Sequence, residues 1–457
     1  MAQAGEAVFD MVLRGNLVTP DGLIEQGWLG IADGRIMAIG GGPHPAARAW
    51  RDHGQDWLLP GAIDGQVHAC SWRGYEGIES TTRSAIAGGV TTIVDMPYDD
   101  PTPLNSAEQL ALKADAISRL AHCDVALYGT LSAHQPVSAI RDMAAAGVCA
   151  IKISSFENHP TRFPRIEPDQ MLEILVAAAE VGLAVGLHNE DQAIVRAATE
   201  RLKAAGEKDI MAHSASRPPA AEMSATAHFL ELAASVGGHA HIVHLSVPRG
   251  FDLVQHYASD GFKATAEMCV HYLLLDEAED GPKLGALMKV NPPIRSHVRD
   301  GLWDALDSGK VTFVSSDHSG WPLARKQAAS IFDVSAGVPG LETLLPGFYT
   351  GLKARGRDDA LQMCARYLSE GPARFFGLWP RKGALAVGMD ADVTVLTLGD
   401  WTYDAGAARD ELQWSPFHGT TFAGRVTSTY LRGTVVLDHL DLTSQAGVGR
   451  FCPRIPG

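Results

Sequence analysis

The sequence predicts an α/β protein: a (β/α)8 barrel, or TIM barrel, with a small β-sandwich domain built from both ends of the chain. Two observations lead to this prediction. Short apolar runs alternate with helical segments through the middle of the chain, and strand-like runs separated by turn signals occupy both ends. The β domain is expected over residues 1–56 and 380–457, and the barrel over residues 57–379.

Eight apolar runs are candidates for the barrel strands. In chain order they are LLPGAIDGQVHA, TTIVDMP, VALYGTLS, AIKISS, AVGLHNE, HIVHLS, KATAEM and VTFVSSD. Helices are indicated between them, because Ser106 and Gln109 have capping-box spacing and Pro168 opens a helical run that Gly182 ends. Strands that alternate with crossover helices are typical of parallel sheets, and eight such units predict a closed barrel.

The ends of the chain have a different character. FDMVLRG, WLGIAD and RIMAIGG, with the turn signals PDG and DG, predict a small antiparallel sheet near the start. DADVTVLTLGD and RVTSTYLRGTVVLD repeat this pattern near the other end. We therefore expect the two ends to pair into one β domain.

Composition narrows the classes of partner and location. The 457 residues are 46% hydrophobic and 20% charged, with a net charge of -15, which argues against nucleic acid or an anionic membrane as a partner. The six cysteines are scattered, which predicts reduced thiols. The opening residues lack the features of a signal peptide, and no apolar run reaches the length of a membrane span. We expect a cytoplasmic protein.

Polar side chains follow the apolar runs at the ends where a barrel carries its chemistry. Three histidines and a carboxylate among them suit a divalent cation such as zinc. A single histidine at a strand end is more commonly a hydrogen-bonded loop residue, but polar residues in order on five strands favour a metal site. The candidates are Gln66, His68, Lys152, His188, His244 and Asp317.

Lys152 is unusual within AIKISS, because an ammonium group in an apolar strand needs a partner or a lowered pKa. One interpretation is a lysine paired with a buried carboxylate. The other is carboxylation by carbon dioxide to N6-carboxylysine, an anionic group that can bridge two metals.

The motifs PGAIDGQVH, GGVTTIVDMP, IKISSF, GLHNE, HIVHLS, NPPIR and VSSDHSG resemble those of the cyclic amidohydrolases of the amidohydrolase superfamily, namely allantoinases, dihydropyrimidinases (hydantoinases) and dihydroorotases. The resemblance covers nearly the whole chain. It implies a homotetramer or homodimer that uses one or two divalent metal ions, zinc in the first instance, to hydrolyse a small cyclic amide.

The resemblance also implies roles for the candidate residues. His68 and Asp317 would bind the more buried metal, and carboxylated Lys152 would bridge to a second metal held by His188 and His244. Metal-bound hydroxide would attack the ring carbonyl, while Asp317 acts as general base and then as general acid.

Neighbouring positions discriminate among the members of the group. Cys70 stands where dihydroorotases have an arginine, and Glu157 stands where dihydropyrimidinases have a tyrosine. WRGYEGIESTTRSAIAGGVTTIVDMP and SPFHGTTFAGRV are most similar to allantoinases. The substrate is thus expected among allantoin-like ureides, hydantoins, dihydropyrimidines, cyclic imides and lactams.

Further residues are candidates for contacts with the substrate or the ligands. Asn291 lies near the expected loop after strand 7, although it also reads as a turn residue before two prolines. Glu267 and His271 follow strand 7 as potential partners of the ligands. The loop at residues 72–75 and the segment at 155–168 are candidate pocket walls or lids. The expected substrate-binding residues are Asn291, Tyr75, Phe156 and Gly337.

Gln66 departs from the family pattern, which has histidine at this position. An amide oxygen is a poorer zinc ligand than an imidazole nitrogen, so the site shared by His68 and Asp317 is weakened while the other is intact. The protein could keep two metals, could act on an atypical cyclic amide or lactam with one metal, or could be a non-catalytic scaffold or small-molecule binder. An introduced substitution is a further alternative. Retention of the other candidate residues favours a hydrolase.

Overall fold

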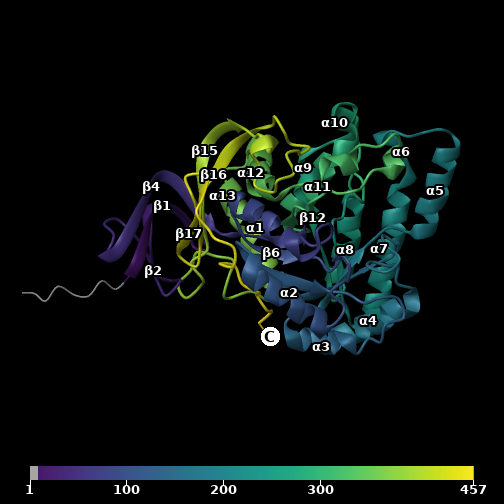
Figure 1. Cartoon of the computed structure of the whole chain (residues 1–457), viewed down its shortest axis with the longest axis horizontal. Helices are drawn as coiled ribbons and strands as arrows, with labels where there is room; N and C mark the ends of the chain where they lie inside the picture. Colours follow the sequence, from purple (N-terminus) through teal and green to yellow (C-terminus); the bar gives the residue numbers. More distant parts are fainter. Residues whose placement is uncertain (1–8, 456–457) are drawn as a thin grey trace, which may run out of the picture.

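The computed structural model describes residues 9–455, and Figure 1 shows a barrel surrounded by helices with a β-rich domain at one side. Residues 1–8 and 456–457 lie outside the described residues. They include most of the opening segment in which no signal peptide is expected, and the outermost ends of the predicted β domain.

The barrel is a closed ring of parallel strands. One sheet has the order β11-β10-β9-β8-β7-β6-β5-β14, and the short strands β12 (Met268–Cys269) and β13 (Val314–Ser315) pair between its two edges. Each of the eight predicted apolar runs contributes to this ring, which confirms the predicted (β/α)8 barrel. The strands of the main sheet are β5 (Ala62–His68), β6 (Val90–Asp95), β7 (Asp124–Gly129), β8 (Ala150–Ser154), β9 (Ala184–His188), β10 (His239–Ile242), β11 (Ala264–Ala266) and β14 (His318–Ser319).

Helices cover the outside of the ring (Figure 1). Ser106 accepts a hydrogen bond from the backbone N–H of Gln109 at the start of α2, and α4 begins at Pro168, as predicted. No helix within residues 9–455 is both long enough and apolar enough to cross a bilayer. The helices are α1 (Gly77–Ala87), α2 (Ala107–Leu120), α3 (Ala139–Ala146), α4 (Pro168–Glu180), α5 (Gln192–Ala204), α6 (Ile210–Ser216), α7 (Pro219–Val236), α8 (Pro248–Ser259), α9 (Val270–Leu274), α10 (Glu277–Leu284), α11 (Arg299–Asp307), α12 (Leu344–Ala354), α13 (Ala360–Ala365) and α14 (Gly371–Phe375).

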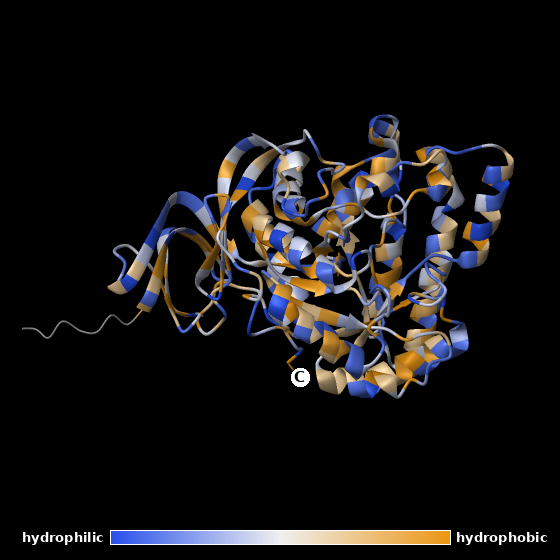
Figure 2. Cartoon of the chain, in the orientation of Figure 1, coloured by the Kyte–Doolittle hydropathy of each residue, from blue (hydrophilic) through white to orange (hydrophobic). Residues whose placement is uncertain are grey.

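The core lies between the strands and the inner faces of these helices. Figure 2 shows hydrophobic residues concentrated on the barrel strands, with hydrophilic residues on the outer helix faces. Every residue of β6, β7, β8 and β9 is buried, as expected for parallel strands covered on both sides. All six cysteines are buried with free thiols, as predicted.

Both ends of the chain contribute to one β-rich domain, as predicted, and its strands form one eight-stranded sheet where a β-sandwich was expected. Its order is β18-β17-β16-β15-β4-β1-β2-β3, with β4 and β15 joining the two ends. One pairing differs from the predicted antiparallel arrangement. After β3 the chain crosses to the far side of β1, so β4 pairs with β1 in parallel. The strands are β1 (Phe9–Thr19), β2 (Gly22–Ala32), β3 (Arg35–Gly41), β4 (Ala47–Pro60), β15 (Val393–Thr402), β16 (Thr421–Leu431), β17 (Thr434–Asp438) and β18 (Asp441–Leu442).

The two parts of the molecule are connected more closely than the predicted boundaries suggest. Strand β4 continues past residue 56 to Pro60 and leads through Gly61 into β5. The last described residues lie along β7, where the backbone N–H of Val125 donates to Arg450 and that of Cys452 donates to Val125. The barrel therefore holds the end of the chain directly.

Candidate active site

The carboxyl ends of the barrel strands form the floor of a cavity of about 510 Å³. The structure brings all six predicted ligands to this cavity, together with Asn291 and Gly337. The six are Gln66, His68, Lys152, His188, His244 and Asp317. We describe them as a bis-histidine half (Lys152, His188 and His244) and an aspartate half (Gln66, His68 and Asp317).

In the bis-histidine half, two imidazoles face each other. His188 Nδ1 lies 3.0 Å from His244 Nε2, and the two rings are steeply inclined with centroids 4.8 Å apart. Burial lowers the pKa of both histidines, and the charge of Lys152 lowers them further. Both rings are consequently neutral near pH 7, the form in which imidazole binds a metal.

A buried ion pair sets the tautomer of His188. Its Nε2 lies 2.8 Å from Glu190 Oε2, and Arg217 forms an ion pair with the same carboxylate. Burial alone would raise the pKa of Glu190, but Arg217 and His188 hold it well below its usual range. An ionised Glu190 accepts a hydrogen bond from Nε2–H of His188, so Nδ1 of His188 presents its lone pair to the cavity.

A second buried pair holds the loop after β10, which carries His244. Glu222 accepts hydrogen bonds from the backbone N–H and the hydroxyl of Ser246, both at 2.7 Å, and Arg295 lies 2.7 Å from the same carboxylate. Arg295 also donates to the backbone carbonyl of Arg217 at 2.9 Å. Both histidine loops are thus tied to one buried charged network.

The aspartate half centres on the carboxylate of Asp317. His68 Nε2 lies 3.4 Å from Asp317 Oδ1, and the amide nitrogen of Gln66 donates to that oxygen at 3.0 Å. Exchanging the amide oxygen and nitrogen would place two acceptors together, so the carboxylate itself fixes the orientation of Gln66. Burial would raise the pKa of Asp317, but His68, His271 and Lys152 outweigh this effect and lower it. Asp317 is therefore ionised near pH 7.

The backbone is strained at two of the predicted ligands. His244 and Asp317 have φ of +38° and +49°, in a region that side-chain-bearing residues rarely adopt. Asp64 stabilises the second of these, because its carboxylate accepts hydrogen bonds from the backbone N–H of Ser316 at 3.0 Å and from the Ser316 hydroxyl. The two strained positions coincide with the site.

Lys152 lines the floor of the cavity with the two histidines of its half. It is 3% exposed, and no carboxylate within residues 9–455 forms an ion pair with its ammonium group. Burial lowers its pKa to about 8, against the charges of Glu267 and Asp317. Burial also raises the pKa of Glu267 to about 8. The alternative of a lysine satisfied by a buried carboxylate is not what the structure shows.

The donor set fits divalent metal ions. Two nitrogen ligands of a tetrahedral zinc are about 3.3 Å apart, close to the 3.0 Å between His188 and His244 and the 3.4 Å between His68 and Asp317. The Oε1 atom of Gln66 is buried without a hydrogen-bond partner in residues 9–455. Each half therefore offers two atoms at the separation of metal ligands, and the unpaired amide oxygen of Gln66 is a further potential ligand.

Two other clusters of potential ligands differ from this site because cations already fill them. Lys113 lies 2.7 Å from Asp95 and 2.8 Å from Asp99, beside Cys70. In the other, Lys382 and Arg432 contact a group of three aspartates, Asp124, Asp390 and Asp392.

The predicted substrate-binding residues separate into two groups. Asn291 lines the cavity with a buried Oδ1 that has no partner in residues 9–455, and Gly337 lines it with φ of +115°. Tyr75 instead packs against the core of the barrel, and Phe156 faces a smaller neighbouring cavity beside Arg217. The structure does not bring these two aromatic side chains to the floor of the site.

The loops around the ligands explain other sequence positions. Glu157 pairs with Arg196 on α5 at 3.0 Å and does not line the cavity, and Cys70, in the loop after β5, is buried. Burial lowers the pKa of His271 to about 4. The negative charge of the nearby Asp317 raises this pKa, but its effect is smaller than that of burial. The carboxylate of Glu267 accepts a hydrogen bond from the backbone N–H of His244 at 3.4 Å.

Several cavity residues escaped the sequence analysis. Tyr98, Trp321 and Arg325 line the cavity, whereas His159 lies in the 155–168 segment that was expected to form a wall. Tyr98, Trp321 and Arg325 lie in the segments after β6 and β14, and no spacing rule marks them. Glu190 had a usable signal, since a carboxylate two residues after a predicted ligand at a strand end is well placed to orient it.

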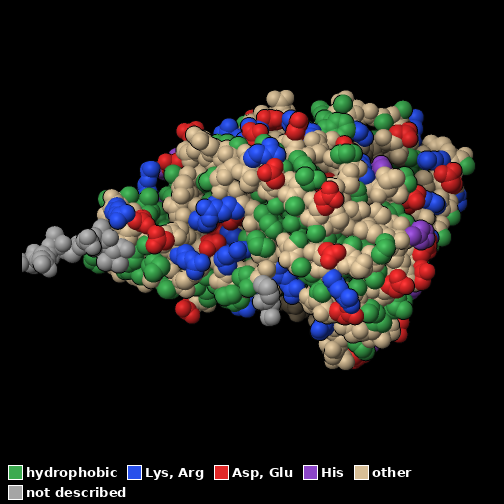
Figure 3. All heavy atoms as spheres, turned by 60° about the horizontal axis from the view of Figure 1, so that its bottom comes forward, with side chains coloured by type: hydrophobic (Ala, Val, Ile, Leu, Met, Phe, Trp, Pro, Cys, Tyr) green, Lys and Arg blue, Asp and Glu red, His purple; other side chains and the backbone are tan. Residues whose placement is uncertain are grey.

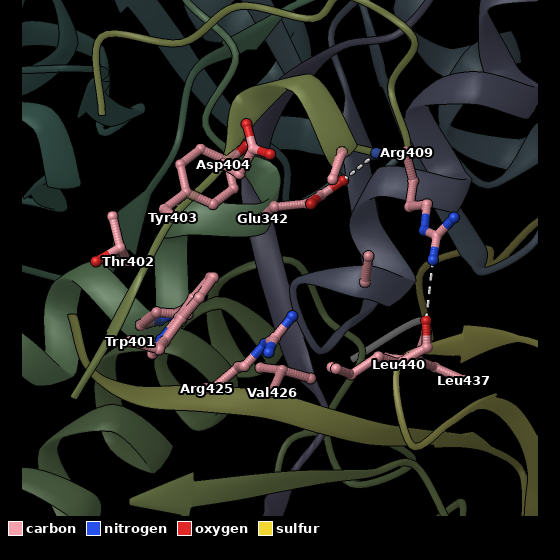
Figure 4. Close-up of a pocket in the computed structure, with 13 residues that line it drawn as sticks. Glu342, Trp401, Thr402, Tyr403, Asp404, Arg409, Arg425, Val426, Leu437 and Leu440 are labelled. Carbon is pink, nitrogen blue, oxygen red and sulfur yellow. Dashed lines mark hydrogen bonds between the residues drawn. The ribbon is translucent and has the colours of Figure 1, made fainter. Parts of the chain in front are cut away.

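A second cavity, of about 360 Å³, lies beside the β-rich domain (Figure 4). Its walls include Trp401, Tyr403 and Arg425, and Glu342 accepts a hydrogen bond from the backbone N–H of Arg409 at 2.5 Å. Among the residues that line it, none is a histidine. This cavity has none of the ligand chemistry found at the barrel end.

The fold and this constellation place the chain in a known class. Residues 57–436 match the model of the amidohydrolase family, and the chain belongs to that family. The chain is similar to the L-hydantoinase of Paenarthrobacter aurescens (32% identity over 98% of each chain) and to the allantoinase of Rubrobacter xylanophilus (34% identity over 97% of this chain and 98% of that protein).

The structural comparison agrees with the sequence comparison. The solved structure of the L-hydantoinase (dihydropyrimidinase) from Arthrobacter aurescens superposes with a TM-score of 0.92, covering 98% of this chain and all of that one, at 31% identity. Hydantoinase and allantoinase relatives thus stand at similar identity to this chain. The predicted family resemblance is confirmed.

Proposed function

We propose that this protein is a metal-dependent hydrolase that opens a cyclic amide of the hydantoin or allantoin type. The observation that carries the proposal is the convergence of side chains from five barrel strands on the floor of one cavity. Hydantoinase and allantoinase relatives that match nearly the full chain support the same class of reaction.

The bis-histidine half would hold one divalent metal, zinc in the first instance, through His188, His244 and carboxylated Lys152. Lys152 is buried without an ion-pair partner in the described part of the chain. Carboxylation would replace this unpaired ammonium group with an anionic carbamate that can bind a metal cation. The aspartate half would hold a second metal less firmly. Bound metal lowers the pKa of water and polarises a carbonyl group.

The protein's own residues supply the proton transfers. Asp317, ionised and oriented by His68 and Gln66, accepts a proton from the attacking water and delivers it to the ring nitrogen as the carbon–nitrogen bond breaks. One water is consumed, and the product carries a new carboxyl group and a freed N–H. The Oδ1 atom of Asn291 accepts a hydrogen bond from a ring N–H.

A specific observation favours a one-metal form as the second candidate. Gln66 presents its amide nitrogen, a hydrogen-bond donor, to Asp317. In this orientation the amide nitrogen of Gln66 orients Asp317 and cannot bind a metal. The bis-histidine half, by contrast, keeps all three of its expected ligands, Lys152, His188 and His244. The hydrolase could accordingly act with a single firmly bound metal.

The test is a panel of allantoin, hydantoin, dihydrouracil and succinimide, assayed with metal-loaded and chelator-stripped protein. Hydrolysis of at least one ring by the loaded form, lost on stripping and restored by zinc, supports the proposal. Bound metal without hydrolysis of any ring, or no bound metal at all, would instead indicate a small-molecule binder or a scaffold. The molar mass of the assembly, measured by light scattering, tests the expected homodimer or homotetramer.

A further inference from the structure

The cavity is larger than its catalytic floor requires. Its volume of about 510 Å³ falls in the range of pockets that enclose drug-sized ligands, and a single cyclic amide ring fills only part of it. Five of the six predicted ligands at the floor are buried and His68 is half-buried, whereas Trp72 is 37% exposed and Arg325 is exposed at the outer end. A ring whose carbonyl lies at the floor would direct its side group toward this rim, which we define as Trp72, Arg162, Trp321 and Arg325.

Arg325 is a cation that the protein holds without neutralising it. Its guanidinium carbon lies 4.3 Å from the ring centre of Trp72 and 5.4 Å from that of Trp321. Trp321 is itself fixed by a hydrogen bond from its indole nitrogen to the carbonyl of Ala336 at 2.8 Å. Within residues 9–455, no carboxylate lies within 4.0 Å of the Arg325 guanidinium. Stacking on tryptophan orients a guanidinium and leaves its N–H groups available.

Arg162 supplies a second guanidinium across the rim. It stacks on Tyr98 at 4.7 Å, and its side chain is only 14% exposed. Its contacts with Asp100 and with the carbonyl of Ser71, both at 3.2 Å, use the same nitrogen, Nη1. By contrast, Arg73 on the neighbouring loop lies 3.5 Å from Glu411 and does not line the cavity.

Two buried lysines stand behind the wall formed by residues 335–337. Lys289 donates to the carbonyls of Ile331 and Val334 at 2.6 Å each, and Lys326 donates to three carbonyls, including that of Gly337 at 2.8 Å. Neither forms an ion pair within residues 9–455. Burial lowers both pKa values to about 7, so these ammonium groups add partial positive charge to this wall near neutral pH.

The positive charge around the outer cavity contrasts with the negative net charge of the whole chain. The chain has a net charge of -15, and Figure 3 shows acidic and basic side chains interspersed over one face. Around the cavity, Asp100 and Asp317 are the only carboxylates among the described lining residues, one paired with Arg162 and the other on the floor. The outer cavity is therefore positive within an acidic protein, an arrangement that attracts anions.

We propose that the substrate is a cyclic amide whose ring substituent ends in a carboxylate, as in a carboxyalkyl hydantoin, and that Arg325 binds that carboxylate with Arg162 contributing from across the rim. This inference rests on the proposed function, because it assigns the side group of the same substrate. A guanidinium pairs with a carboxylate in a bidentate manner, and a neutral side group would leave Arg325 with no such partner.

The test compares 5-(2-carboxyethyl)hydantoin with its primary amide, which has nearly the same shape and no charge. With the metal-loaded protein we expect kcat/KM to favour the acid by about 10- to 100-fold, and this ratio to fall as sodium chloride is raised. Arg325→Gln should reduce the ratio to near one. Arg201→Gln, which removes an exposed arginine on α5 remote from the cavity, should preserve it.

The outcomes separate the inference from the proposed function. If hydantoin and the amide are hydrolysed but the acid has no advantage, or if Arg325→Gln keeps the full preference, the inference is overturned and the hydrolase stands. If no ring is hydrolysed, the proposed function fails, and calorimetric binding of the same pair decides the inference. Tighter binding of the acid that depends on Arg325 supports it, and equal binding of acid and amide overturns it.

Discussion

The two halves of the ligand cluster differ in what surrounds their side chains. In the bis-histidine half, the ion pair of Glu190 with Arg217 and that of Glu222 with Arg295 fix the loops that carry the imidazoles. In the aspartate half, no arginine–glutamate pair supports the ligands among the contacts described: Asp317 accepts a hydrogen bond from the Gln66 amide, His68 contacts the Ser71 hydroxyl, and an amide replaces an imidazole. The comparison teaches that the proposed metal site in the bis-histidine half is supported by buried ion pairs, whereas the proposed base in the aspartate half is oriented by an amide.

Asp317→Asn breaks the comparison most severely, because it removes the proposed base and leaves the bis-histidine half intact. We expect kcat to fall by about 10²- to 10⁴-fold, while the metal in the bis-histidine half is retained. Steady-state kinetics and elemental analysis of the same preparation check this result. Asp115→Asn, at an exposed position on α2, is the matched control, and near-normal activity of Asp317→Asn would refute the base assignment.

Glu190→Gln tests the support of the bis-histidine half. A neutral amide holds the Nε2 proton of His188 less firmly and leaves Arg217 without its charge partner, so metal affinity should fall about 10- to 100-fold. Competition with a chromophoric chelator measures this change. Ser71→Ala removes the partner of His68 Nδ1 and should leave this affinity unaltered; an equal effect of both substitutions would remove the distinction between the halves.

Gln66→His sharpens the comparison by returning an imidazole to the aspartate half. We expect the metal content to rise from about one to about two equivalents, because imidazole is a better zinc ligand than an amide oxygen. Gln66→Leu, which preserves volume and removes the donor to Asp317, should lower turnover without changing metal content. Unchanged stoichiometry in Gln66→His would show that the wild-type aspartate half already binds metal well.

The smallest expected effect is a loss of folding stability at acid pH that arises in the β-rich domain and not at the site. Burial lowers the pKa of His53, in the β-rich domain, to about 4. The unfolded chain binds a proton there below about pH 6.5 while the folded chain does not, so this contribution to stability is complete above pH 6.5 and is lost as the pH falls toward 4.

The magnitude is modest and can be isolated. Near pH 5 the loss should be roughly 2 kcal/mol, measured as the free energy of unfolding in urea at several pH values. His53→Gln can still reach the hydroxyl of Tyr430, the partner of His53 Nε2 at 2.9 Å, and it cannot take up a proton. Its stability should vary less with pH in this window, and a slope equal to that of the wild type would contradict the assignment.

The barrel and the convergence of the candidate ligands on one cavity were predictable because they depend on local periodicity. Each apolar run ends in a polar residue, and parallel strands bring those ends together, so the order of residues along the chain gives the site directly. The β-rich domain was predictable for the same reason, since strands at both ends share one pattern. The parallel pairing of β1 with β4 was not, because the direction of a strand depends on where the chain crosses.

The walls of the cavity could not be predicted in the same way. Tyr75 and Phe156 lie in the loops that the sequence indicated, yet the turn of each loop directs the side chain elsewhere. Arg325 lies in a segment with no motif, and its role depends on two tryptophans separated from each other by 249 positions, Trp72 and Trp321. Loop geometry of this kind arises from tertiary packing, which spacing does not encode.

The most direct test of the central claim is an anomalous difference map recorded at the zinc edge from crystals of zinc-loaded protein. A strong peak between His188 Nδ1 and His244 Nε2, with a weaker one or none between His68 and Asp317, is the predicted result. A map with its only peak beside Asp317, or with no peak at the barrel end, would contradict it.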